Sequence, residues 1–516
     1  MSPADPSPRL PARPPASPAA VAEAFEAAWN AGQNQLVTIR LAADLDTPVS
    51  LMLKLAEAAP MSFMLESVTG GEVRGRYSIV GMKPDLIWDC RDGRARINRQ
   101  ARFSDDFRPD DRPALDSLRA LIAESRIEAM PDGVPPVAAG LFGYLGYDMI
   151  RLVERLPHVN PDPLDLPDAM LMRPSVVAVL DGVKGEVTLC APVWRNGGDN
   201  ARAAYAQAAE RVMDALRSLD RQPSEPRALG HDARIGEPVS NFSKADYLAA
   251  VEKAKNYIRA GDIFQVVPSQ RWRMDFPLPP FALYRSLRRT NPSPFMFFLN
   301  LGGFQIVGAS PEILVRLRDG EVTIRPIAGT RPRGADEAQD RALEADLLAD
   351  RKELAEHLML LDLGRNDVGR VSKPGTVRPT EQFVIERYSH VMHIVSNVVG
   401  DLREGEDALS ALLAGLPAGT VSGAPKVRAM EIIDELEPEK RGVYGGAVGY
   451  FAANGEMDMC IAMRTGVLKD GALYIQAGGG VVYDSDPEAE FTETVNKSRA
   501  LQRAAEGAAR FVRGNQ

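Results

Sequence analysis

Residues 326–334 read Pro-Ile-Ala-Gly-Thr-Arg-Pro-Arg-Gly, a turn-like segment between a strand pattern and a helix pattern. Glycine and proline favour a turn there, and arginine side chains pair well with carboxylates. We therefore expect this segment to bind a small carboxylated molecule. Its third residue is Ala328, which has no amine to act as a nucleophile.

Around this segment, strand and helix patterns come in groups. Asp92-Gly93 and Asp181-Gly182 predict hairpin turns in the first half of the chain. Helices are predicted from Val21 onward and over residues 200–219, 243–259, 337–363, 424–436 and 486–508. Because strands and helices do not alternate strictly, we expect an α+β fold rather than a doubly wound α/β fold.

Composition divides the chain into regions. Residues 1–20 are rich in proline, alanine and serine, which predicts a disordered tail. Residues 221–240 are polar, with several prolines and glycines, and predict a linker. The linker separates an amino-terminal region, residues 21–220, from a second region, residues 241–516.

Charge and composition exclude several classes of function. A formal net charge of −9 argues against a nucleic-acid partner. No apolar run is long enough to cross a bilayer, and residues 1–20 lack the apolar core of a signal peptide. Cys90, Cys190 and Cys460 fit no disulfide framework or metal spacing. We therefore expect a cytoplasmic protein with no membrane partner.

Two pairs of glutamates have a spacing that places both carboxylates on one side of a helix. They are Glu353 with Glu356, and Glu490 with Glu493. Two such helices offer the oxygen ligands that Mg²⁺ prefers. The alternative is two solvated helix faces, with Glu493 and Lys497 in an ordinary surface ion pair.

Small-residue turns predict a place for an anion. The glycine triplet at residues 478–480 lies between a strand pattern and a capped helix, so its N–H groups form either an anion-binding nest or a tight turn. Thr420 lies in a similar turn that leads into a helix. Tyr444 begins a strand pattern, and Arg464 follows one.

Two residues are candidates for acid–base chemistry. Glu312 ends a strand pattern, and burial there would raise its pKa into the range of a general acid. His393 alternates with apolar residues in a strand-like segment and could present its imidazole to a cavity. The alternatives are a turn acid and a structural histidine, and for His357 we expect the structural role.

Together, these segments resemble the chorismate-utilising enzymes, most closely the anthranilate synthase component I members of that family. The resemblance covers the chain from about Val21 and is densest from Phe242 to Ala500. Eight segments agree in order: residues 261–271, 310–312, 326–334, 352–367, His393, residues 419–426, Arg464 and residues 478–497.

The resemblance implies a large interleaved β-sandwich of two antiparallel-rich sheets flanked by helices. It implies Mg²⁺ held by Glu356 and Glu493, with Glu353 and Glu490 in support, against the ring carboxylate of chorismate. It assigns catalysis to Glu312, His393, Thr330 and Lys497. It assigns chorismate binding to Thr330, Thr420, Tyr444, Arg464, Gly478, Gly479, Gly480 and Lys497.

The implied reaction is the amination of chorismate by ammonia, with Glu312 as general acid, followed by loss of pyruvate near His393 to give anthranilate. This is the first step of tryptophan biosynthesis. A separate glutamine amidotransferase subunit is expected to supply the ammonia, in one heterodimer or two.

Related reactions are distinguished by two positions. Isochorismate-type members carry a lysine near Gln265, and aminodeoxychorismate synthases often carry one where Ala328 stands. This chain has no lysine at either position, which favours anthranilate as the product. The alternatives are 4-amino-4-deoxychorismate synthase component I and a catalytically silent sensor of chorismate or tryptophan.

A feedback site for tryptophan is also implied. Residues 64–67 and 76–78 resemble the amino-terminal feedback motif, and residues 291–298 resemble its second wall. For residues 295–298 the alternative is an ordinary core strand. The residues implied at this site are Glu66, Ser67, Arg76, Pro294, Met296, Val448, Tyr450 and Cys460.

Overall fold

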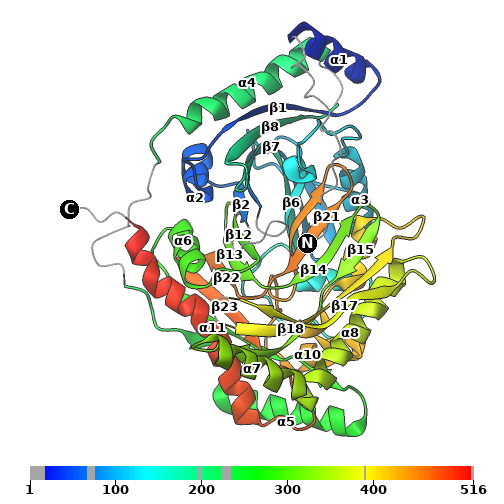
Figure 1. Cartoon of the computed structure of the whole chain (residues 1–516), viewed down its shortest axis with the longest axis vertical. Helices are drawn as coiled ribbons and strands as arrows, with labels where there is room; N and C mark the ends of the chain where they lie inside the picture. Colours follow the sequence, from blue (N-terminus) through cyan, green and yellow to red (C-terminus); the bar gives the residue numbers. More distant parts are fainter. Residues whose placement is uncertain (1–17, 67–75, 196–199, 224–233, 389–390, 513–516) are drawn as a thin grey trace.

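The computed structural model describes residues 18–66, 76–195, 200–223, 234–388 and 391–512. Twenty-one strands join in one antiparallel network with helices around it, which confirms the predicted α+β class (Figure 1). A separate two-stranded sheet contains β10 (Gln265–Val266) and β19 (Gly423–Ala424). Among the described residues, no helix is both long enough and apolar enough to cross a membrane.

The network has two arms, which correspond to the two predicted sheets and share the long strands β3 (Tyr77–Arg91) and β7 (Ala169–Asp181). The first arm adds β1 (Gln35–Ala42), β8 (Glu186–Val193), β2 (Ser62–Glu66), β12 (Phe295–Asn300), β13 (Gln305–Ser310), β22 (Thr465–Lys469), β23 (Ala472–Gly478), β11 (Ser269–Asp275) and β9 (Val239–Ser240). The second adds β4 (Arg94–Asn98), β5 (Arg108–Pro109), β6 (Gly140–Leu145), β20 (Ala447–Ala452), β21 (Met457–Ile461), β14 (Ile313–Arg318), β15 (Glu321–Ile324), β18 (Val391–Asp401), β16 (Ile327–Pro332) and β17 (Arg378–Arg387).

The first crossing between the arms lies in the middle of β3 and β7. Pro84 pairs with Pro174, and the register shifts between Pro84 and Leu86. Proline has no N–H to donate, so the ladder is interrupted there. Lys83, with φ +50°, turns the backbone at the same point. The two halves of each strand can therefore belong to different arms.

The second crossing lies where β13 leads into β14 and where β21 leads into β22. Gly308 pairs with Thr465 in the first arm, and Ile313 pairs with Cys460 in the second. Between these pairs the backbone remains hydrogen-bonded, from Ala309 N to the Arg464 carbonyl at 3.2 Å and from Ile461 N to the Glu312 carbonyl at 3.1 Å. The chain thus changes arms at Pro311, and again at Arg464.

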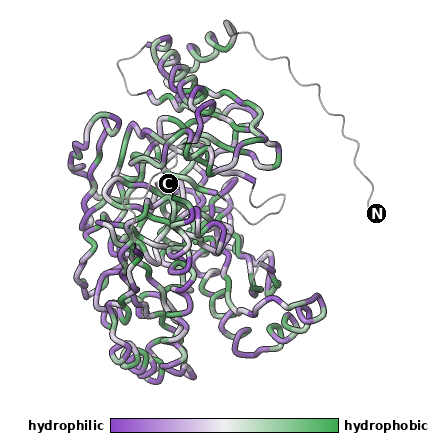
Figure 2. The backbone as a smooth tube through the Cα atoms, turned by 90° about the vertical axis from the view of Figure 1, so that its left-hand side faces the viewer, coloured by the Kyte–Doolittle hydropathy of each residue, from purple (hydrophilic) through white to green (hydrophobic). Residues whose placement is uncertain are grey.

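The helices cover the outside of the arms (Figure 1). In Figure 2 the visible coils carry both hydrophilic and hydrophobic residues, as expected for helices with one buried face. Near β1 and β8 lie α1 (Pro18–Asn30) and α4 (Ala201–Leu219), and α2 (Pro48–Leu51) packs against β3. The others are α3 (Ala114–Glu124), α5 (Lys244–Ala260), α6 (Pro280–Thr290), α7 (Glu337–Ala349), α8 (Arg351–Val371), α9 (Ala408–Gly415), α10 (Lys426–Leu436) and α11 (Pro487–Gly507).

One predicted helix was wrong. Residues 337–363 were expected to form a single helix, but α7 ends at Ala349 and α8 begins at Arg351. Asp350, with ψ 105°, leaves the helical conformation, and its side chain accepts from the N–H groups of Lys352 and Glu353. An aspartate in that role is a typical N-cap, so it starts a new helix instead of continuing the old one.

The predicted regions are only partly described. Residues 1–17 of the predicted tail and residues 224–233 of the predicted linker lie outside the described residues. Residues 18–20, however, already belong to α1, and Val239–Ser240 form β9. Strands from the two regions pair directly, β2 with β12 and β6 with β20. The two regions therefore share one sheet network.

The buried ion pair of Glu437 and Arg441 connects three segments of the chain. Glu437 accepts from Arg441 at 2.6 Å and from Ser269 N at 2.7 Å. Arg441 also donates to the carbonyls of Val421 and Val267, both at 2.6 Å. The pair thus joins β11, the loop before α10 and the loop before β20.

We expect Glu437→Gln to lower the free energy of unfolding by about 3 kcal/mol, because Arg441 would keep a buried charge without a counter-ion. Glu337→Gln is the matched control, since Glu337 and Arg341 also stand four residues apart but are 81% and 72% exposed. That control should cost less than about 0.5 kcal/mol. Urea unfolding of both variants checks the difference, and equal losses would contradict it.

Candidate active site

Glu312 lies at the second crossing, and its side chain is only 5% exposed. Thr420, in the short helix Gly419–Val421, donates its hydroxyl to the carboxyl group at 3.2 Å. Burial raises the pKa of Glu312 to about 8, although Thr420 and the positive charge of Arg464 oppose the shift. At neutral pH this side chain is therefore mostly protonated and can donate a proton.

His393 lies on β18, directly opposite Thr330 on β16. Its Nδ1 is 3.0 Å from the Thr330 hydroxyl and 3.2 Å from the Gly329 carbonyl. A carbonyl can only accept, so we assign the proton to Nδ1, which leaves the lone pair on Nε2. Burial lowers the pKa of His393 to about 4, so the imidazole is neutral and can act as a base.

Arg464 connects these two groups electrostatically. Its charge lowers the pKa of both Glu312 and His393. Among the described residues its guanidinium has no hydrogen-bond partner, and burial lowers its own pKa. A half-buried guanidinium with unused donors is suited to binding a carboxylate. Its φ of +49° is part of the backbone turn at the crossing.

The segment at residues 326–334 differs from the predicted turn. Residues 327–332 form β16, and a bulge at Gly329, with φ +67°, aims its carbonyl at His393. The two arginines are already paired, Arg331 with Asp346 at 2.7 Å and Arg333 with Asp340 at 2.8 Å. These arginines are therefore not free to bind a substrate carboxylate, and the prediction that this segment binds one through its arginines was wrong.

One N–H group of the glycine triplet already has a partner. Gly478 ends β23, and Gly479 donates its N–H to the Pro268 carbonyl at 3.2 Å. Three side chains also occupy the space that a Cβ on these glycines would fill. A Cβ on Gly478 would lie 3.0 Å from the Tyr444 hydroxyl, one on Gly479 3.0 Å from Glu490 Oε2, and one on Gly480 2.9 Å from Gln265 Nε2.

Tyr444 and Lys497 both meet the end of β23. Burial raises the pKa of Tyr444 to about 12, so its hydroxyl stays neutral and can donate. Lys497 donates to the Gly478 carbonyl at 2.9 Å and pairs with Glu493 at 2.7 Å. The surface ion pair considered as an alternative is therefore present, but it also anchors the backbone of the glycine segment.

The two glutamate pairs lie on facing helices, α8 and α11. Burial raises the pKa of Glu356, and the nearby carboxylates of Glu353 and Glu493 raise it further. Burial also raises the pKa of Glu490, and Glu493 adds to the shift. Gln265 donates to Glu356 at 3.2 Å. The four carboxylates are therefore close enough to repel one another.

These carboxylates suit a hard divalent cation by their chemistry. Glu490 Oε2 and Gln265 Oε1 are buried and have no hydrogen-bond partner among the described residues. Oxygen donors of this kind fit Mg²⁺, which keeps open positions for water and substrate. Within the described ranges, however, no three acidic, histidine or cysteine side chains gather closely enough to hold a metal alone.

The residues of the predicted feedback site lie on strands of both arms and pack in two core clusters. Met296 packs in one core cluster, whereas Val448 and Cys460 pack in another. Glu66 is bound by Arg288 at 2.6 Å. Arg76 forms an ion pair with Asp181 at 2.6 Å. Pro294 is half-buried, and Tyr450 packs against the core cluster that contains Val448 and Cys460. Ser67 lies outside the described residues.

Two neighbours of the site were not predicted as site residues. Gln265 was used only to distinguish related reactions, yet it contacts Glu356. Its place after a helix in the segment at residues 261–271 was the available signal. The Tyr388 ring packs edgewise against the His393 ring, with 5.7 Å between the ring centroids. No local sequence pattern indicated that Tyr388 would lie there. His357 has the structural role predicted, fully buried and 2.6 Å from the Ser396 hydroxyl.

Known proteins with similar sequences or folds can be compared with this geometry. A family model described as chorismate binding enzyme matches residues 83–503. A protein of Cereibacter sphaeroides named anthranilate synthase component 1 is 78% identical over 95% of this chain and 98% of its own length. One of that name from Pseudomonas aeruginosa is 52% identical over 92% of this chain and 96% of its own.

Solved structures agree with the sequences. The crystal structure of anthranilate synthase component I from Streptococcus pneumoniae matches with a TM-score of 0.73 and 38% identity, over 84% of this chain and 94% of that one. The menaquinone-specific isochorismate synthase of Escherichia coli matches with a TM-score of 0.70 and 18% identity, over 94% and 99%, which shows the fold alone. The chain therefore belongs to the family of chorismate binding enzymes, together with the proteins named anthranilate synthase component 1.

Proposed function

We propose that the chain is a component I anthranilate synthase, which converts chorismate and ammonia to anthranilate and pyruvate. One observation carries the proposal. A protonated carboxyl, Glu312, and a neutral imidazole, His393, both lie within the field of Arg464. Environments that push two pKa values apart create an acid and a base in one site. The reaction needs both, and the named relatives support the choice of substrate.

In the first step, ammonia adds at C2 of chorismate while the hydroxyl on C4 leaves. Glu312 donates the proton that turns this hydroxyl into water. In the second step, His393 Nε2 removes the proton from C2 as the ether bond between the ring and the enolpyruvyl group breaks. The enolpyruvate that leaves takes up a proton at its methylene carbon and becomes pyruvate. The ring becomes aromatic, which drives the step, while Arg464 and Tyr444 bind the pyruvyl carboxylate and orient it.

The amine must come from ammonia itself. Ala328 is half-buried on β16, next to the bulge at Gly329, and carries no group that could form a covalent adduct with the ring. This supports direct attack by free ammonia rather than by an enzyme-bound amine. We propose that a glutamine amidotransferase subunit supplies the ammonia, in keeping with the component 1 naming of the relatives. Sparse, unpaired cysteines favour a reducing compartment, the cytoplasm.

We propose that Glu356 and Glu493 hold Mg²⁺, with Glu353 and Glu490 in support. When bound, the cation would neutralise the ring carboxylate of chorismate. Two features support this assignment. Burial and the neighbouring carboxylates raise the pKa of Glu356 and of Glu490, and Glu490 Oε2 is buried without a partner among the described residues.

We also propose that tryptophan inhibits the reaction by binding beside the first arm. Strand pairing connects the implied tryptophan site with Glu312. Phe295, on the second wall of the implied site, pairs with Ser310, and Cys460 pairs with Ile313. These partners flank Glu312. A ligand that moves β12 or β21 would therefore shift the crossing that carries the acid.

Incubated with chorismate, ammonium and Mg²⁺, the isolated chain should form anthranilate, which its fluorescence reveals. A chelator should stop the reaction, and added Mg²⁺ should restore it. Accumulation of aminodeoxychorismate would identify the runner-up reaction instead, and no product in any condition would contradict catalysis by this chain.

A matched pair of variants tests the metal residues in the same assay. Glu356→Gln should raise the Mg²⁺ concentration needed for half-maximal rate by more than about tenfold, since one oxygen ligand loses its charge. Glu488→Gln is the control, because Glu488 lies on the first turn of α11 but pairs with Lys244 at the surface. An unchanged Mg²⁺ requirement in Glu356→Gln would remove Glu356 from the metal site.

Glu312→Gln should lower the turnover rate at least about a hundredfold, because an amide cannot donate the proton. Chorismate binding should persist. In the wild-type chain the rate should fall as the pH rises through about 8, since Glu312 is then deprotonated. Rates must be compared at equal free ammonia. A variant that keeps full turnover, or a flat profile from pH 7 to pH 9, would exclude Glu312 as the acid.

Saturating tryptophan should inhibit the wild-type chain. Ser67→Phe should abolish this inhibition while leaving turnover without tryptophan nearly unchanged, because a ring at that position would occupy the ligand's space. Inhibition curves for both chains provide the measurement. Equal sensitivity of the two chains would place the effector elsewhere.

A further inference from the structure

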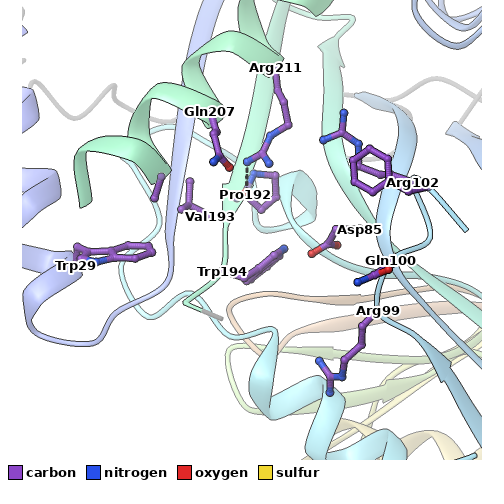
Figure 3. A pocket seen from close by; sticks show the side chains of 12 residues that line it. Trp29, Asp85, Arg99, Gln100, Arg102, Pro192, Val193, Trp194, Gln207 and Arg211 are labelled. Carbon is purple, nitrogen blue, oxygen red and sulfur yellow. Dashed lines mark hydrogen bonds between the residues drawn. The ribbon is translucent and has the colours of Figure 1, made fainter. Parts of the chain in front are cut away.

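A cavity lies at the end of the molecule where α1 and α4 meet β8 (Figures 1 and 3). Its volume is about 530 Å³, within the range of pockets that hold small molecules. Among its lining residues are Trp29, Trp194, Arg102, Gln207 and Arg211. None of them belongs to the site described above.

Two donors in this cavity lack acceptors. Trp194 is only 9% exposed, and its Nε1 is buried with no hydrogen-bond partner among the described residues. Arg211 donates through Nη2 to the Pro192 carbonyl at 2.9 Å, but its Nε is likewise buried and unpartnered. Buried polar groups almost always find a partner. Both groups are donors only, so the missing partner is an acceptor.

The charge of the cavity favours an anion. Arg102 is exposed and makes no ion pair in the described part of the chain, and its charge, together with burial, lowers the pKa of Arg211. The other charges of the lining are already balanced. Arg173 binds Asp85 at 2.8 Å, and Glu124 binds Arg99 at 2.8 Å. Two guanidiniums, those of Arg102 and Arg211, therefore have no ion-pair partner among the residues that the structure describes.

The walls of the cavity favour an aromatic ring. Trp29 and Trp194 both line the cavity (Figure 3), and Phe103, also in the lining, is 84% exposed. Arg173 covers one face of the Trp194 ring at 4.8 Å, which holds the indole in place. Flat apolar walls beside unpaired guanidiniums match a ring that bears a negative group.

We propose that this cavity binds a small aromatic carboxylate, with its ring against Trp29 and Trp194. The carboxylate accepts from Trp194 Nε1 and Arg211 Nε and lies near the charge of Arg102. The site is separate from that of the proposed reaction. Its occupancy does not depend on whether the chain forms anthranilate.

Titration with benzoate, followed by tryptophan fluorescence, tests the proposal on the full chain. Benzoate should quench saturably, whereas neutral benzamide and inorganic phosphate should bind at least about tenfold more weakly. Arg102→Ala and Arg211→Gln should each weaken benzoate binding about tenfold. Arg102 is exposed, so its removal should leave the fold intact, as thermal unfolding would verify.

Two further variants locate the binding. Arg202→Gln alters an exposed arginine on the same helix, α4, and should bind benzoate as the wild type does. Arg464→Gln alters the candidate active site and should also leave this binding unchanged. The proposal is overturned if benzamide or phosphate binds as tightly as benzoate. It is also overturned if binding is lost in Arg464→Gln but kept in the cavity variants, or if no saturable quenching occurs below about 10 mM.

Discussion

The second crossing between the arms is the constraint on which the site depends. Its two strands change arms at Pro311 and Arg464, yet their backbones stay hydrogen-bonded across the change. Residues held at such a point are enclosed by both arms and have little freedom to rotate. Glu312 is buried for this reason, and Arg464 projects from a backbone turn that its φ of +49° defines.

Burial in the candidate active site has opposite effects on two kinds of group. It stabilises the neutral form of each, so it raises the pKa of a carboxyl and lowers that of an imidazole. One physical cause therefore supplies both an acid and a base at neutral pH. Arg464 opposes the first shift and strengthens the second, and it keeps its own donors for an anion.

The loops around the crossing are fixed by further buried and half-buried contacts. The buried pair of Glu437 and Arg441 fastens the segment before β20, from which Tyr444 projects. Lys497 holds the carbonyl of Gly478, and the absence of side chains at residues 478–480 lets Tyr444, Glu490 and Gln265 approach the backbone. The glycines thus make room for these side chains.

The sequence alone determined the α+β class, most helix positions and the residue types of the site. Local signals sufficed there: hydrophobic periodicity, capping residues and Asp-Gly turns depend on near neighbours. The boundary at Asp350 and the strand at residues 327–332 were missed, because turn and helix propensities are weaker than capping and sheet pairing. Tertiary structure alone decided that Arg331 forms an ion pair with Asp346 and Arg333 one with Asp340, and that Glu312 is buried. Pairing and burial arise from residues distant in the chain, which no local pattern encodes.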